Sequence, residues 1–245
     1  MQLLRKFSTF IGLAALLTMA GACSSSSDTT GPATTPTTIA PPITTTIVDT
    51  TTVPDTTVPA ATQPAIWPAA DVVFTTPEAA ATDFLAAVFG EGPVIGEFMA
   101  GDSRSGEFEV FATADGAVIG EARSVLFMRQ LGASDGWFVL AAGSDTATIT
   151  EPASMATVPA APLEVSGAGS GYEATLNVSA FVAGDAAHLD EQIVMAGNFG
   201  ELLPYTTTVD LSTAASGDIV VLLTIGTTGL ETDPGTFSAI PVVIA

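Results

Sequence analysis

The sequence has few cations, one thiol and one histidine. Its 245 residues include five Lys and Arg, one Cys and one His against 26 Asp and Glu, and the formal net charge is −21. Nucleic-acid binding depends on Lys and Arg that neutralise phosphates, so this composition argues against it. Because Cys23 is the only cysteine and His188 the only histidine, the chain can form neither an internal disulfide nor a multi-histidine zinc site.

The single cysteine follows a short apolar segment at the N-terminus. Arg5 and Lys6 precede an apolar stretch, residues 7–22, which ends in small residues and is shorter than the roughly 20 residues of a comfortable membrane span. Residues 1–22 resemble a bacterial lipoprotein signal peptide, in which the cysteine after the cleavage site is acylated. We therefore expect an extracytoplasmic protein that is lipid-anchored to the bacterial cell membrane through Cys23.

Removal of the signal would leave a strongly acidic chain without lysine. The remaining cations are Arg104, Arg123 and Arg129. A lysine Schiff base is then excluded, and so is a cysteine nucleophile once Cys23 carries lipid. We expect Arg123 and Arg129 to pair with nearby carboxylates. A partner, if there is one, would be a cation, a basic protein or a neutral glycan; alternatively, the acidity serves solubility alone.

A linker that cannot form a core follows the cysteine. Residues 23–68 are rich in Thr, Pro and Ser and show no sustained helical or strand period. This composition predicts a disordered, extended stalk that holds the folded part away from the membrane.

A small α+β domain is predicted for residues 69–145. Thr76-Pro77-Glu78 has the N-cap, the first-turn proline and the early acid of a helix start, and Gly90 is placed to end the helix. The apolar residues between them share one helical face: Ala81, Phe84, Leu85, Val88 and Phe89. Strand-like runs separated by the turn signals Asp115-Gly116 and Asp135-Gly136 follow at residues 106–113, 123–131 and 136–142. We expect the helix to pack on an antiparallel sheet.

An all-β domain is predicted for residues 146–245. About seven apolar runs suggest an antiparallel sandwich, at residues 147–150, 163–165, 174–182, 192–196, 206–211, 218–225 and 239–244. In the third run, alternation predicts that Asn177 and Ser179 face solvent. The run Ile219-Val220-Val221-Leu222-Leu223 does not alternate, which indicates a central strand. The segment Gly167-Ala168-Gly169-Ser170-Gly171 is interpreted as a Gly-rich turn.

The same region resembles the immunoglobulin-like domain of bacterial spore germination proteins. The segments that carry the resemblance are Gly136–Val139, Ile149–Pro152, Pro162–Gly167, Tyr172–Val178 and Ile240–Ile244. It implies an immunoglobulin-like β-sandwich in an exported, often lipid-anchored protein that is often preceded by another small domain. It implies no catalytic residues and does not establish a role in germination.

The residues available for catalysis are few. His188 and Asp190 could belong to a Ser-His-Asp set, but no Gly-x-Ser-x-Gly motif lies between a strand and a helix. The pair Asp190 and Glu191 could serve glycoside hydrolysis only with a partner across a cleft. We therefore expect no enzymatic activity, no catalytic residues and no cofactor.

Calcium binding is the alternative use of the acidic loops. Carboxylates that cluster in presumed loops could bind this ion: Asp185, Asp190, Glu191, Glu231 and Asp233. No EF-hand spacing is present, so we assign no metal site and interpret these residues as solvated turn acids.

Two functional classes remain. The first is a lipid-anchored, non-enzymatic interaction or structural module of the cell envelope, with an envelope protein or glycan of unknown identity as its partner. The second is a solute- or glycan-binding lipoprotein with a pocket in the first domain around Phe84, Phe108, Phe127 and Trp137. Packing in the core is the alternative role of these aromatic residues.

Overall fold

The computed structural model describes residues 64–198, 200–230 and 232–245. The predicted signal peptide, Cys23 and most of the predicted stalk lie outside the described residues.

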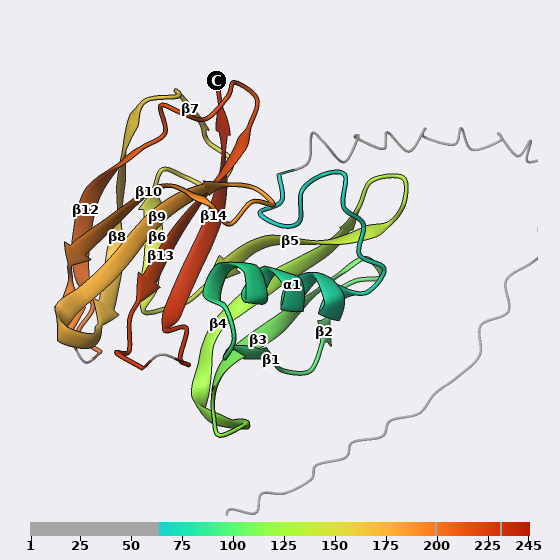
Figure 1. Ribbon diagram of the computed structural model, residues 1–245, viewed down its shortest axis with the longest axis horizontal. Helices are drawn as coiled ribbons and strands as arrows, with labels where there is room; N and C mark the ends of the chain where they lie inside the picture. The colour runs from blue at the N-terminus through green and yellow to red at the C-terminus, as the bar shows by residue number, and fades with distance from the viewer. Residues whose placement is uncertain (1–63, 199, 231) are drawn as a thin grey trace, which may run out of the picture. The chain divides into compact units, whose positions relative to one another are not determined.

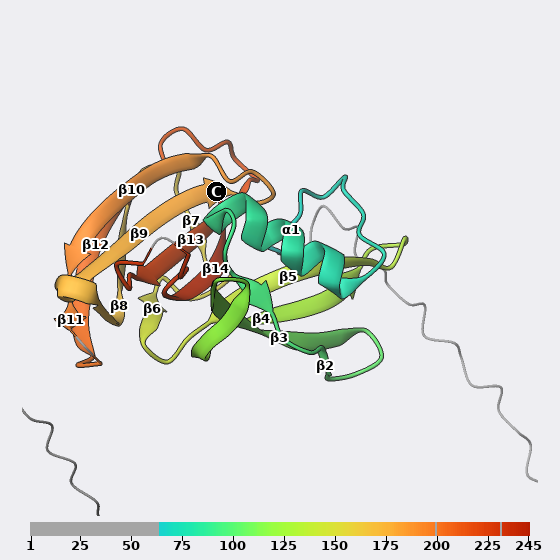
Figure 2. The same ribbon diagram turned by 60° about the horizontal axis from the view of Figure 1, so that its bottom comes forward.

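One helix, α1 (Pro77–Phe89), packs across one face of three long strands (Figures 1 and 2). Its N-cap is Thr76, whose hydroxyl accepts a hydrogen bond from the amide of Ala79 at 3.2 Å, and Gly90 follows the last helical residue with φ of 74°. Both predicted helix signals are therefore confirmed, because each satisfies a local backbone requirement. Phe84 and Leu85 are buried against the sheet.

The three strands form consecutive hairpins. They are β3 (Ser105–Ala114), β4 (Ala117–Leu131) and β5 (Gly136–Gly143), and two short strands, β1 (Val94–Ile95) and β2 (Met99–Ala100), pair with the outer edge of β3. Positive φ angles of 51° at Asp115 and 76° at Gly116 make the tight turn between β3 and β4, as the sequence predicts.

The rest of the chain adds strands to this sheet and builds a second one. These strands are β6 (Ala147–Glu151), β7 (Thr157–Val158), β8 (Pro162–Gly171), β9 (Thr175–Val182), β10 (His188–Met195), β11 (Gly197–Asn198), β12 (Leu203–Asp210), β13 (Ile219–Gly226) and β14 (Thr236–Ile244). The larger sheet has the order β1-β3-β4-β5-β14-β13-β9-β10, and β7 pairs with β14. The smaller sheet has the order β11-β8-β12, and β6 pairs with β8. Most pairs are antiparallel; β7–β14 and β8–β11 are parallel.

The middle of the larger sheet is buried on both faces. Val221 and Leu223 of β13 join the core that includes α1, whereas Val220 and Leu222 join the core shared with the smaller sheet. This double burial explains why the run in β13 does not alternate, and the predicted central strand is confirmed. It also corrects the prediction for Ser179, which is buried because both faces of β9 are covered.

A second correction concerns the predicted Gly-rich turn. Residues 167–171 lie within β8, where residues 167–169 pair with β12 and residues 170–171 pair with β11. A Cβ atom at Gly167 would clash with the carbonyl oxygen of Thr148, and one at Gly169 would clash with the side chain of Leu176. These glycines therefore allow neighbouring strands to pack closely and do not reverse the direction of the chain.

The described residues are mainly β with one helix and mainly antiparallel sheets, an arrangement compatible with a β-sandwich. The predicted boundary between residues 145 and 146 falls in the turn between β5 and β6, and the larger sheet runs across it. The division into two domains stays a prediction.

Two serines reinforce the seam between β14 and its neighbours β4 and β5, at the point where the pairing of β5 with β14 is interrupted. The register between these strands contains one residue pair, Ala142 and Ala239. Beside it, the hydroxyl of Ser124 donates to the carbonyl oxygen of Phe237 and accepts from its amide, both at 2.8 Å. The hydroxyl of Ser238 accepts from the amide of Ser144 at 3.0 Å. Side chains thus replace part of the hydrogen-bond ladder at this seam.

Candidate functional site

The four aromatic residues of the predicted pocket do not surround a cavity. Phe84, Phe108 and Trp137 are part of the core that α1 closes. Phe127 instead is 39% exposed, because it alternates with the buried Leu126 and Met128 and so projects from the opposite face of β4. Three of the four residues therefore pack in the core, and the fourth, Phe127, lines a different site on the opposite face of the sheet.

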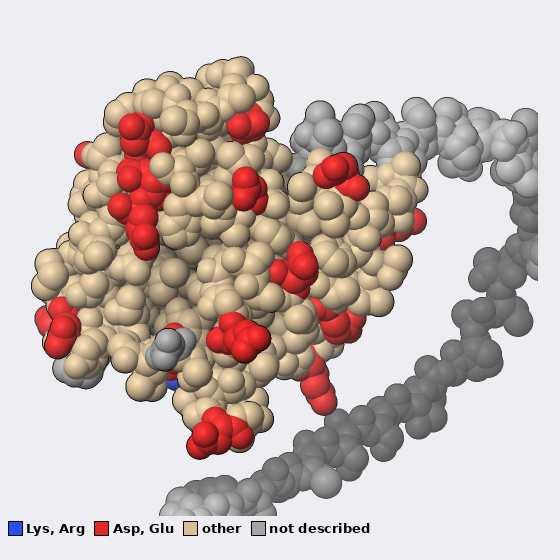
Figure 3. Space-filling model, viewed as in Figure 1, with Lys and Arg blue, Asp and Glu red and all other residues tan. Residues whose placement is uncertain are grey.

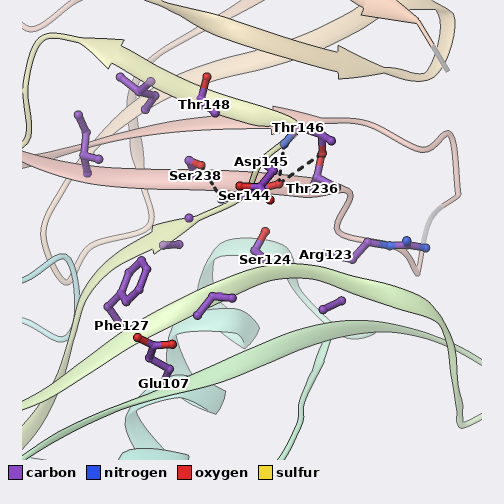
Figure 4. Close-up of a pocket in the computed structure, with 16 residues that line it drawn as sticks. Glu107, Arg123, Ser124, Phe127, Ser144, Asp145, Thr146, Thr148, Thr236 and Ser238 are labelled. Atoms are coloured by element: carbon purple, nitrogen blue, oxygen red, sulfur yellow. Dashed lines mark hydrogen bonds between the residues drawn. The ribbon is translucent and has the colours of Figure 1, made fainter. Parts of the chain in front are cut away.

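That site is an open groove of about 610 Å³ beside the seam (Figure 4). β14 lies along the middle of the groove, with β4 and the end of β5 on one side and β6 on the other. We call it the seam groove; its lining includes Glu107, Phe127, Asp145, Thr148, Thr236 and Ser238. The chain leaves the larger sheet after β5, and β6 pairs with β8 in the smaller sheet, so β6 forms the opposite wall of the groove from β4 and β5.

Hydroxyl groups dominate the polar lining, and several of them have structural partners. Ser124 and Ser238 hold the seam, and Thr148 exchanges two hydrogen bonds with the backbone of Ala168 at 3.0 and 3.1 Å. The hydroxyl of Thr236 forms no hydrogen bond with another described residue and is half-buried. Thr236 can therefore donate to or accept from a ligand.

The groove carries a net negative charge. Arg123 forms two hydrogen bonds with the carboxylate of Asp233, at 2.9 and 2.7 Å, and the Asp233 side chain is 1% exposed. The predicted pairing of Arg123 with a carboxylate is thus confirmed. Glu107 and Asp145 have no ion-pair partner among the described residues. The groove therefore presents two carboxylates, while the charge of its arginine is neutralised.

The histidine lies elsewhere. Nδ1 of His188 is 3.7 Å from Oε2 of Glu191, and its ring stacks on Phe181 with the centroids 6.4 Å apart. Asp190 does not orient this ring; its carboxylate accepts a hydrogen bond from the amide of Asp210 at 2.8 Å and others from the side chain of Gln192. Within the described part of the chain, no serine hydrogen-bonds to His188. The structure does not bring a Ser-His-Asp set together there.

The acidic residues considered for calcium do not form a common site, and two of them have other partners. Asp185 accepts from the amide of Ala187, and Asp233 pairs with Arg123. Glu231 lies outside the described residues. Residues 64–198, 200–230 and 232–245 contain no group of three or more His, Cys, Asp or Glu that could hold a metal ion. Figure 3 shows acidic side chains spread over the visible face.

Three carboxyl groups have a lowered pKa because of hydrogen bonds. The amide of Asp210 lowers the pKa of Asp190, and the hydroxyl and amide of Ser212 lower the pKa of Asp210. The amide of Arg104, with a smaller contribution from the charge of Arg129, lowers the pKa of Asp102. All three groups stabilise turns or strand ends and lie outside the seam groove.

Comparisons with protein-family models, with curated proteins and with solved structures find no match to this chain. The resemblance to the immunoglobulin-like spore germination domain therefore stays a prediction. No helix in the described part of the chain is long and apolar enough to cross a membrane.

Sequence reasoning did not find the seam groove, because its walls come from strands that are distant along the chain. One local signal was available for Phe127. It shares its face of the predicted strand with Arg123 and Arg129, and two arginines on one face indicate that this face meets solvent. The lining residues of β6 and β14 carry no such signal.

Proposed function

We propose that this chain is a lipid-anchored, non-enzymatic binding module of the bacterial cell envelope. In this proposal, acylated Cys23 tethers the protein to the outer side of the cell membrane, residues 23–68 act as a stalk, and residues 146–245 form an immunoglobulin-like sandwich. The seam groove supports binding as the activity, since it is open, is lined by polar groups and an exposed ring, and measures about 610 Å³, a volume typical of ligand sites.

The side chains of the groove favour binding over catalysis. Its serines are engaged in the seam, its arginine is paired, and the histidine of the chain lies on β10. A nucleophile next to a general base is the usual arrangement for covalent catalysis, and His188 has no such neighbour among the described residues. A ligand bound in the groove should therefore be released unchanged.

The tether is tested by metabolic labelling with a radioactive fatty acid. The full chain should incorporate the label at its processed N-terminus, and the Cys23→Ala variant should incorporate none, because the thiol is the acylated atom. Ser24→Ala is the matched control and should be labelled like the parent chain. An unlabelled parent chain, or label retained by Cys23→Ala, would overturn the lipid anchor.

The binding role is tested with envelope fragments that contain both protein and glycan. The full chain should sediment with these fragments, and substitution Phe127→Leu in the groove should reduce the bound fraction, whereas Glu164→Gln on the exposed face of β8 should not. Equal sedimentation of all three proteins would show that the groove is not the binding surface.

A further inference from the structure

The exposed ring in the seam groove packs against the neighbouring strand. The ring of Phe127 lies against β5 at Gly143, where an added Cβ atom would be 3.2 Å from the nearest ring carbon. Because Gly143 has no side chain, the ring can rest on the backbone and still be 39% exposed toward the groove (Figure 4). Such a ring is a preorganised apolar platform, which lowers the entropic cost of stacking a ligand on it.

A carboxylate lies beside this platform. Glu107 on β3 is the register partner of Phe127 on β4, so the two side chains project from the same face of the sheet. Figure 4 shows both at the same end of the groove. An ionised carboxylate accepts hydrogen bonds only, and therefore suits a ligand with several donors around an apolar face. A sugar ring has this form, with a C–H face and a rim of hydroxyl groups.

The charge of the groove selects against anions. Glu107 and Asp145 line it without ion-pair partners among the described residues, and Arg123 is already bound to Asp233. The only lysine of the chain is Lys6, so lysine does not contribute to the lining. Phosphorylated, sulfated or uronic-acid polymers would meet repulsion here. Neutral hydroxyl-rich ligands would not, and hydroxyls such as that of Thr236 can bond with them.

The groove continues beyond one binding position. A second hollow of about 290 Å³ shares Thr146 and Thr236 with its lining. Thr227 and Thr228 also line this second hollow, together with Tyr172, which is 44% exposed. An aromatic residue thus lines each hollow, and the two hollows share Thr146 and Thr236. This repetition suits a chain of similar units better than one compact solute.

We propose that the seam groove binds a linear neutral glycan, with one sugar stacked on Phe127 and its hydroxyls hydrogen-bonded to Glu107. The next sugars pass Asp145 and Thr236 toward Tyr172. This proposal rests on the binding role proposed above and specifies its ligand; no bond is made or broken.

The test is isothermal titration of the full chain in a detergent without a sugar head group. The neutral probes are cellohexaose, maltohexaose and chitohexaose, the acidic probe is hexagalacturonate, and the basic probe is hexalysine. We expect at least one neutral hexasaccharide to bind, with little change between about 0.05 and 0.5 M NaCl, and hexagalacturonate not to bind. Phe127→Leu should weaken binding about tenfold, the usual scale of one lost aromatic contact.

Two further variants control for folding and charge. Glu107→Gln should also weaken binding, whereas Glu164→Gln, which removes an exposed carboxylate on β8, should leave it unchanged. All variants should keep the parent melting temperature within a few degrees, which separates lost binding from lost structure.

The outcomes that contradict the proposal are specific. Binding of hexalysine alone, with strong weakening by salt, would assign the groove to basic peptides. Absence of binding by every neutral hexasaccharide at millimolar concentration would overturn the glycan assignment. Either result would leave the lipid anchor and the sedimentation test untouched, so failure of this proposal is distinguishable from failure of the proposed binding role.

Discussion

Substitution Ser124→Ala is expected to destabilise the protein far more than the loss of one small side chain suggests. Ser124 is 2% exposed, and its hydroxyl bonds to both the amide and the carbonyl of Phe237 at 2.8 Å. Alanine leaves both backbone groups without these partners at a point where β5 and β14 share one residue pair. A buried polar group that loses its partner costs about 1–3 kcal/mol, so the two together should cost about 2–6 kcal/mol.

The assay is urea unfolding of the full chain, followed by circular dichroism, together with thermal melting. For a folded region of this size, about 2–6 kcal/mol corresponds to a decrease in Tm of about 4–24 °C. Ser134→Ala, at an exposed position in the turn after β4, is the matched control and should change the free energy of unfolding by less than about 0.5 kcal/mol. A loss for Ser124→Ala as small as that of the control would refute the role assigned to the seam serines.

Two further predictions concern charged groups. Asp233→Asn should lower the free energy of unfolding by about 3 kcal/mol, because it leaves Arg123 without the buried carboxylate that binds it. Urea unfolding measures this loss, and an unchanged urea midpoint would contradict the prediction. Hydrogen bonds hold the pKa values of Asp190 and Asp210 below their usual 3.8, so their contribution to stability is fully present above that value and is lost as the pH falls through the lowered pKa values. As the pH is lowered from about 5 to about 2, the urea concentration at the unfolding midpoint should therefore fall less steeply for Asp190→Asn than for the parent chain. Identical slopes would contradict the stabilising role of the Asp190 carboxylate.

The sequence predicts those parts of the fold that local physics determines. Thr76 and Gly90 delimit α1 because each satisfies the backbone of one helix end, and the run in β13 indicates burial on both faces. Long-range placement accounts for the failures. Ser179 is buried because a second core covers β9, and Gly167 lies in a strand because β6 passes close to it. Neither neighbour can be identified from the residues around these positions.

The candidate site was less predictable than the fold. The sequence indicates Phe127 as an aromatic residue of a pocket, but its partners Glu107 and Thr236 come from β3 and β14. The antiparallel register places Glu107 beside the ring, and the interrupted pairing of β5 with β14 opens the groove. Both facts depend on how strands that are far apart in the chain align, and residue type alone does not contain that information.

The most direct test of the binding account is a chemical-shift map by NMR of the full chain during titration with the neutral hexasaccharide that binds most tightly. If the seam groove binds the glycan, the largest changes are confined to its lining, including the backbone amides of Phe127, Gly143 and Thr236. Changes centred on another surface, such as β10, or no saturable changes at all would contradict it.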